Sequence, residues 1–233
     1  MASIRIEATD GSGGFDAYVA RPAGGAPTGV VVVIQEIFGV NAAMRQTCDW
    51  IADMGFIAIC PDLFWRITPG VDITDKSEAE WQQAFALMNA FDQDKGVEDL
   101  TATLAVARTL DGGNGRAGTM GFCLGGRMAF LMALRSDADV NVSYYGVGLD
   151  GLVGEAGRIR RPLLVHIAEG DKFVPPPARA AILSGVAGNG AIQAWVYPGV
   201  DHAFARIGGV SWNGRAATIA NGRTAEALAG ALG

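Results

Sequence analysis

The sequence predicts an α/β fold with a mostly parallel central sheet and helices on both faces. Apolar, β-branched runs alternate with segments of helical periodicity along the 233 residues, and strands that alternate with helices imply parallel pairing. Half of the residues are hydrophobic and only 18% are charged, which suits a sheet buried on both faces. The length fits a single domain over residues 1–233.

The predicted strands begin with an antiparallel pair. Segments 4–8 and 15–20 alternate in polarity around the turn-rich TDGSGG segment. The run 30–34 is continuously apolar and β-branched, as expected of a central parallel strand. Further strands are expected over 56–64, closed by Pro61, and over 116–122, 140–146, 162–168 and 192–198.

Helices are predicted between and after these strands. Asn41 is a suitable N-cap for a helix over 42–55 that ends at Gly55. Helical spacing continues in two pieces, 77–91 and 96–110, with the DQDK segment as a loop between them. Three more helices are expected over 125–136, 176–186 and 212–232.

Composition and charge exclude several classes of function. The net charge is −6 and no block is rich in Lys or Arg, which argues against a nucleic-acid partner. The start lacks the features of a secretory signal, and no apolar run reaches the roughly 18 to 20 residues of a membrane span. Three cysteines, Cys48, Cys60 and Cys123, cannot all pair within the chain, so we expect a reducing, cytoplasmic environment. Cys48 and Cys60 are interpreted as buried packing residues.

Residues 121–125, GFCLG, have the G-x-nucleophile-x-G pattern of a strand-to-helix elbow. Glycines at positions 121 and 125 allow the turn to pack closely against the strand and the helix, which leaves the Cys123 side chain above the sheet. The following helix N-terminus favours a thiolate. The alternative is that Cys123 is a small buried hydrophobe in a tight turn.

A base and an orienting acid can be sought by position in the chain. His202 follows a predicted strand, where a loop would carry it to the top of the sheet, whereas His166 lies within an apolar strand and suits a hydrogen-bonded core residue. The order nucleophile, acid, base favours Asp171, which follows the intervening strand. Glu169 and Asp201 are its rivals.

Glu36 directly follows a buried strand, where an unpaired charge is costly. Two interpretations stay open: a partner elsewhere, such as Arg45 or Arg127, or an interaction with the Cys123 thiol. The backbone amides of Ile37 and Leu124 fall where this architecture places an oxyanion hole.

The motifs VVVIQEIFGVN, GFCLGGRMAF, YYGVGL, GDKFVP and DHAFAR together resemble the dienelactone hydrolase family of the α/β-hydrolase fold, nearly end to end. The resemblance implies a Cys-His-Asp triad of Cys123, His202 and Asp171. It also implies that Glu36 contacts the cysteine in the resting enzyme, and that binding of an anionic substrate helps to release the thiolate. No metal or organic cofactor is implied.

The resemblance further implies a small unsaturated lactone whose carboxylate is held by two arginines. Arg206 matches one of them, with a solvated surface charge as the alternative. Trp81 stands at the position of the other arginine, near the start of the predicted helix 77–91, and its alternative interpretation is a helix residue packed on the core. Phe85 of the same helix stands where a tyrosine is common. Losing a charge-assisted contact costs about 1.5 to 3 kcal/mol, so we expect a pocket that favours less polar or neutral esters. Phe38 and Tyr145 are expected to contact the substrate.

The function expected from this resemblance is cysteine-dependent opening of dienelactone-type enol lactones (carboxymethylenebutenolide) to a keto acid (maleylacetate) through an acyl-enzyme. A carboxylesterase or thioesterase with a less polar pocket is the alternative. A non-catalytic binding protein and a redox sensor at Cys123 are hypotheses of other classes. The expected partner is a small lactone or ester, with no nucleic acid or membrane, and the expected state is a monomer.

Overall fold

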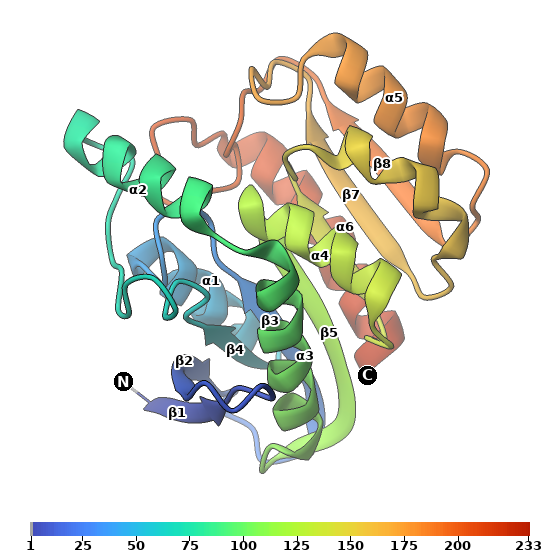
Figure 1. The fold of residues 1–233 in the computed structure, drawn as a ribbon. Helices are drawn as coiled ribbons and strands as arrows, with labels where there is room; N and C mark the ends of the chain where they lie inside the picture. The colour runs from blue at the N-terminus through green and yellow to red at the C-terminus, as the bar shows by residue number, and fades with distance from the viewer. Residues whose placement is uncertain (1) are drawn as a thin grey trace.

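The computed structural model describes residues 2–233, which form an eight-stranded sheet in the order β1-β2-β4-β3-β5-β6-β7-β8 (Figure 1). The pairs β1–β2 and β2–β4 are antiparallel, and the other neighbouring pairs are parallel. The strands are β1 (Ala2–Glu7), β2 (Gly14–Ala20), β3 (Thr28–Ile34), β4 (Ile57–Pro61), β5 (Gly113–Phe122), β6 (Asn141–Tyr144), β7 (Leu163–Ala168) and β8 (Ile192–Tyr197). The predicted mostly parallel sheet is thus confirmed.

Helices cover both faces of the sheet, as predicted. They are α1 (Ala42–Asp53), α2 (Glu78–Ala90), α3 (Gln93–Thr109), α4 (Leu124–Arg135), α5 (Pro176–Val186) and α6 (Gly214–Leu232). Helices α1 and α6 contribute to the apolar cluster on one face, and α3, α4 and α5 to the cluster on the other (Figure 1). Helix α2 lies at the edge where the parallel strands end.

Strand β3 shows why the sheet is buried on both sides. Its residues Val31 and Val33 belong to the cluster beneath α1 and α6, while Val30, Val32 and Ile34 belong to the cluster beneath α3 and α4. All five are fully buried. A continuous β-branched run therefore serves two cores at once, because alternate side chains of a strand point to opposite faces.

Local signals account for the helix starts. The Asn41 side chain accepts the Met44 N–H at 3.1 Å, which makes it the predicted cap of α1. Ser77 caps α2, and the Glu80 carboxylate accepts the Ser77 hydroxyl at 2.8 Å. The predicted loop DQDK is wrong in part, because Asp92 caps α3 and the helix already begins at Gln93.

Other differences lie at element ends and in one connection. Strand β5 begins at Gly113 rather than at residue 116, and α6 begins at Gly214 after its cap, Asn213. Two short 3-10 helices, Leu149–Gly151 and Val153–Arg158, fill the connection after β6. Their turns are too short to give a periodic signal in the sequence. Within residues 2–233, no helix combines the length and the apolar character that a membrane span requires.

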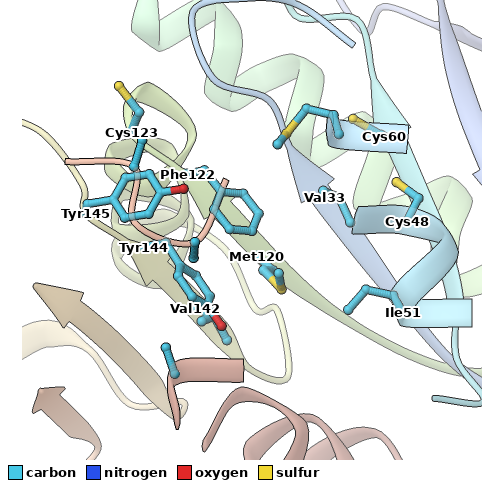
Figure 2. Packing of buried hydrophobic residues seen from close by; sticks show 14 of the residues in the cluster. Val33, Cys48, Ile51, Cys60, Met120, Phe122, Cys123, Val142, Tyr144 and Tyr145 are labelled. Atoms are coloured by element: carbon cyan, nitrogen blue, oxygen red, sulfur yellow. The ribbon is translucent and has the colours of Figure 1, made fainter. Parts of the chain in front are cut away.

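The three cysteines are unpaired and buried. Cys48 of α1 and Cys60 of β4 lie in one apolar cluster with Met120 of β5, which confirms that both are packing residues (Figure 2). Cys123 lies at the other end of this cluster, and its sulfur points away from Met120 (Figure 2). Its position at the end of β5 therefore differs from that of the two packing cysteines.

Candidate active site

Cys123 occupies a strained turn between β5 and α4. Its φ is 55°, which is uncommon for a residue other than glycine. A Cβ on Gly121 would lie 2.0 Å from the carbonyl oxygen of Gly125, and a Cβ on Gly125 would lie 2.3 Å from that of Ile34. Both positions therefore require glycine, which explains the spacing of the GFCLG motif.

His202 and Asp171 meet at the same edge of the sheet. Asp171 follows β7 and His202 follows β8, and the ring nitrogen Nδ1 of His202 lies 2.6 Å from Oδ2 of Asp171. The other oxygen of Asp171 accepts the N–H of Phe173 at 2.8 Å. The rival carboxylates bind backbone amides instead: Glu169 accepts the N–H of Gly199, and Asp201 that of His202 itself.

The imidazole of His202 is buried, and its environment favours the charged form. Burial by itself would lower its pKa, but the neighbouring Cys123 and the hydrogen bond to Asp171 outweigh that effect and raise the pKa of His202 from 6.5 to about 10. The other ring nitrogen, Nε2, has no hydrogen-bond partner within residues 2–233. It is thus available to a group in the cavity that His202 and Cys123 both line.

Two backbone amides lie beside this turn. Strands β3 and β5 are neighbours with Ile34 opposite Gly121, so the segment after β3 that carries Ile37 runs next to the Cys123 turn. Leu124 is the first residue of α4, where backbone N–H groups have no acceptor within the helix. The two amides predicted to form an oxyanion hole are therefore at neighbouring strand ends.

Glu36 is paired with an arginine, but not with either of those named from the sequence. Arg206 donates from Nε to Oε2 of Glu36 and from Nη2 to Oε1 at 3.1 Å. Arg45 instead pairs with Asp72 at 2.8 Å, and Arg127 donates to Gln93 and to the carbonyl of Gly148. Among residues 2–233, no hydrogen bond joins the Glu36 carboxylate to the Cys123 thiol, because both carboxylate oxygens accept from Arg206.

Arg206 is a buried residue rather than a solvated surface charge. Its third bond runs from Nη1 to Oδ2 of Asp75 at 2.6 Å, and its side chain is only 5% exposed. Burial by itself would lower the pKa of Arg206, but Glu36 outweighs this and holds the pKa above its usual range. Asp75 was not identified from the sequence, because it lies in a connection with no periodic pattern.

A cavity of about 220 Å³ opens above Cys123 and is mostly apolar. Trp81 packs edge-on against Phe38 with ring centroids 5.0 Å apart, and Phe85 packs beside Trp81 at 5.4 Å. Together they form one wall. The complete lining comprises Ile37, Phe38, Trp81, Phe85, Met88, Cys123, Val147, Phe173, His202 and Arg206.

Tyr145 lies outside the cavity in which the sequence analysis placed it, and three residues that line the cavity were not predicted. Tyr145, expected to contact the substrate, does not line the cavity; its ring packs against His202 at 5.0 Å, and its hydroxyl has no hydrogen-bond partner within residues 2–233. Met88, Val147 and Phe173 line the cavity but were not singled out. Only Phe173 offered a signal, because it lies two residues after Asp171. His166 is a core residue as expected, bound to Tyr197 and Thr224.

A model of the dienelactone hydrolase family matches residues 15–232 of the chain. The chain belongs to the dienelactone hydrolase family. It is 58% identical over 226 residues to an Azospirillum brasilense protein named "Putative carboxymethylenebutenolidase". The alignment covers 97% of this chain and 96% of that protein. It is 42% identical to the carboxymethylenebutenolidase of Pseudomonas putida, over 97% and 95% of the two chains.

A solved structure supports the same assignment. The crystal structure titled "Putative Dienelactone Hydrolase", from Klebsiella pneumoniae, superposes with a TM-score of 0.84 at 26% identity and covers 98% of both chains. The chain has the α/β-hydrolase fold, and its membership of the dienelactone hydrolase family makes it a hydrolase.

Proposed function

We propose that this member of the dienelactone hydrolase family opens dienelactone-type enol lactones (carboxymethylenebutenolide) to a keto acid (maleylacetate), with Cys123 as nucleophile, His202 as base and Asp171 as the acid that orients the base. The observation that carries the proposal is the contact between Nδ1 of His202 and Oδ2 of Asp171 at 2.6 Å. It leaves Nε2 of the imidazole available in the cavity that Cys123 also lines. The names of the relatives support the substrate class.

Acylation starts with the thiolate of Cys123. Its sulfur attacks the lactone carbonyl carbon, and the carbonyl oxygen takes the negative charge, which the N–H groups of Ile37 and Leu124 stabilise. Collapse of this intermediate breaks the ring C–O bond and leaves a thioester on Cys123. The released enolate takes a proton from the His202 imidazolium and tautomerises to the ketone.

Deacylation uses the imidazole that has just lost its proton. Neutral His202 removes a proton from water, and the resulting hydroxide attacks the thioester carbonyl. Collapse of the second intermediate breaks the C–S bond, releases the acid and returns Cys123 to the thiolate. Asp171 holds the ring in one orientation throughout and stabilises the imidazolium when it forms.

Turnover of the purified protein with cis- and trans-dienelactone, beside simple esters, tests this proposal. Loss of the conjugated lactone absorbance and appearance of the keto acid by NMR are expected for at least one isomer. Stability of both lactones and of the esters in the presence of folded protein would contradict the proposal.

A carboxylesterase with a less polar substrate is a second candidate. The aromatic wall of Phe38, Trp81 and Phe85 favours it, because this wall offers apolar contact where a second arginine would hold a carboxylate. The two candidates use the same chemistry at Cys123. A higher kcat/KM for neutral aryl esters than for dienelactone would favour the second.

A further inference from the structure

Buried hydrogen bonds centred on His166 join strands β6, β7 and β8 to helix α6. Nδ1 of His166 lies 2.8 Å from the hydroxyl of Tyr197, and Nε2 lies 3.0 Å from the hydroxyl of Thr224. The rings and hydroxyls concerned are almost completely removed from solvent. The His166 network, as we call it, comprises the side chains of Arg223, Tyr197, His166, Thr224, Tyr144 and Asn221.

The protons of the His166 network can be placed from its first end. Arg223 can only donate, and its Nη1 donates to the hydroxyl of Tyr197 at 2.9 Å. The hydroxyl proton of Tyr197 is therefore directed to Nδ1 of His166. Burial, and then the charge of Arg223, lower the pKa of His166 to about 3, so the ring is neutral at pH 7. Its one proton is then on Nε2, which donates to Thr224.

The second end of the network gives the same direction. Tyr144 donates its single hydroxyl proton to Oδ1 of Asn221 at 2.9 Å. Thr224 must then donate to Tyr144 across the 2.7 Å between their hydroxyl oxygens, and its own oxygen accepts from Nε2 of His166. Each hydroxyl thus accepts one hydrogen bond and donates one, so the network runs in a single direction from Arg223 to Asn221.

One side of the network holds the turn that carries the nucleophile. The backbone carbonyl of Tyr144 accepts the N–H of Cys123 at 3.0 Å. The ring of Tyr144 stacks on Phe122, directly before Cys123, with ring centroids 4.7 Å apart (Figure 2). The φ of 55° at Cys123 is strained, and such strain persists only where the surrounding structure holds it. A displaced Tyr144 would therefore displace the sulfur.

The other side of the network joins the strands that lead to the acid and the base. His166 lies in β7, which Asp171 follows, and Tyr197 is the last residue of β8, which His202 follows. The bond between Nδ1 of His166 and the Tyr197 hydroxyl thus ties the two strands together beside the starts of both loops. The carbonyl of Tyr197 also accepts the N–H of Glu169 at 3.0 Å.

From this arrangement, and resting on the proposed hydrolysis at Cys123, we infer that His166, Tyr197 and Thr224 are positioning residues that align the triad through one directional set of hydrogen bonds. The network contacts the segment before each triad residue, and catalytic groups lose rate steeply when they are misplaced. None of the three positioning residues lines the cavity, so substrate binding does not depend on them. Neither the family match nor the relatives' names assign them a role.

The first test is the tautomer of His166 in the wild-type protein. A long-range proton–nitrogen NMR spectrum of isotope-labelled protein at pH 7 distinguishes a protonated from an unprotonated ring nitrogen. The chain has two histidines, so comparison with His202→Asn identifies the signals of His166. We expect Nε2 protonated and Nδ1 unprotonated. A proton on Nδ1, or on both nitrogens, would overturn the inference whatever the variants do.

The second test interrupts the network at Thr224. Valine keeps the volume of threonine but can neither accept from His166 nor donate to Tyr144. In Thr224→Val, kcat for a p-nitrophenyl ester is expected to fall about tenfold while KM stays as in the wild type. The rate is expressed per mole of folded protein, measured by near-ultraviolet circular dichroism, so that partial unfolding does not lower it.

Thr224→Ser is the rescue variant. Serine restores the hydroxyl but loses a buried methyl group, so kcat should stay within about threefold of the wild type although the protein is less stable. Packing alone predicts the opposite order, because valine fills the site better than serine. Tyr18→Phe is the matched control for loss of a hydroxyl: Tyr18 donates to Asp49 at 2.8 Å, outside the network, and kcat should not change.

Three kinetic outcomes would overturn the inference. They are an unchanged kcat in Thr224→Val, a loss in Thr224→Ser as large as that in Thr224→Val, and an equal loss in Tyr18→Phe. All three leave the proposed hydrolysis standing, because the wild-type protein still turns over the ester. Absence of turnover by the wild-type protein would contradict the proposed hydrolysis and this inference together.

Discussion

Nδ1 of His202 lies 2.6 Å from Oδ2 of Asp171, and both side chains are almost completely buried. This contact directs Nδ1 to the Asp171 carboxylate and Nε2 to the cavity. The ring is also held between aromatic neighbours, Tyr145 at 5.0 Å and Phe173 at 4.9 Å. The orientation of the imidazole therefore depends on packing as well as on the carboxylate.

Replacement of Asp171 by Asn should slow catalysis far more than it affects folding. The amide keeps the shape but removes the charge that stabilises the imidazolium and selects its tautomer, so kcat is expected to fall on the order of 10⁴-fold. Steady-state kinetics with a p-nitrophenyl ester measure the effect. The control is Asp201→Asn, because the one hydrogen bond of the Asp201 carboxylate within residues 2–233 is to the backbone N–H of His202. Comparable losses in the two variants would contradict the assignment.

His166 should make the protein less stable in acid. Burial, and then the charge of Arg223, lower the pKa of His166 from 6.5 to about 3. The unfolded chain therefore binds this proton more readily than the folded protein does. The contribution of neutral His166 to the free energy of unfolding is complete above pH 6.5 and is lost as the pH falls towards 3. Urea unfolding between pH 6 and pH 4 should show a loss of about 1.4 kcal/mol per pH unit that is missing in His166→Asn. Equal slopes in both proteins would be inconsistent with a neutral, buried His166.

Trp81→Arg should add to the cavity a cation that, unlike Arg206, is not paired with Glu36 and Asp75. Trp81 lines the cavity beside Phe38 and Phe85, and an arginine there would approach a substrate carboxylate. For p-nitrophenyl esters, the ratio of kcat/KM for the glutarate monoester, which carries a carboxylate, to kcat/KM for the neutral pentanoate is expected to rise about tenfold relative to the wild type. Trp81→Phe is the control, since it loses the indole hydrogen bond to Asp75 without adding charge. A ratio that rises equally in both variants would mean that the added charge is not the cause.

Features with local causes were predictable from the sequence. The continuous β-branched run 30–34 indicated a central strand, Asn41 indicated a helix start, and the glycines around Cys123 indicated the elbow. Chain order placed the orienting acid after the strand between Cys123 and His202, where both Asp171 and its rival Glu169 lie, and Asp201 was disfavoured because it adjoins His202.

Features that depend on packing between distant loops were not predictable. Glu36 and Arg206 are 170 residues apart, and nothing in either segment indicates that they pair. Asp75 lies between elements, where the sequence has no period to interpret, and its contacts with Arg206 and Trp81 follow only from the folded connection. Tyr145, directly after β6, has a backbone φ of 37° that the sequence does not indicate, and its ring packs against His202 rather than lining the cavity.

The most direct test of the central claim is mass spectrometry of the protein quenched during turnover of a slowly hydrolysed p-nitrophenyl ester. The wild-type protein should gain the mass of one acyl group, located by digestion on the peptide that contains Cys123. Cys123→Ala should gain none and should have lost hydrolysis, whereas Cys48→Ala, which alters a packing cysteine, should behave like the wild type. Hydrolysis that persists in folded Cys123→Ala, or an acyl group on another residue, would contradict the account.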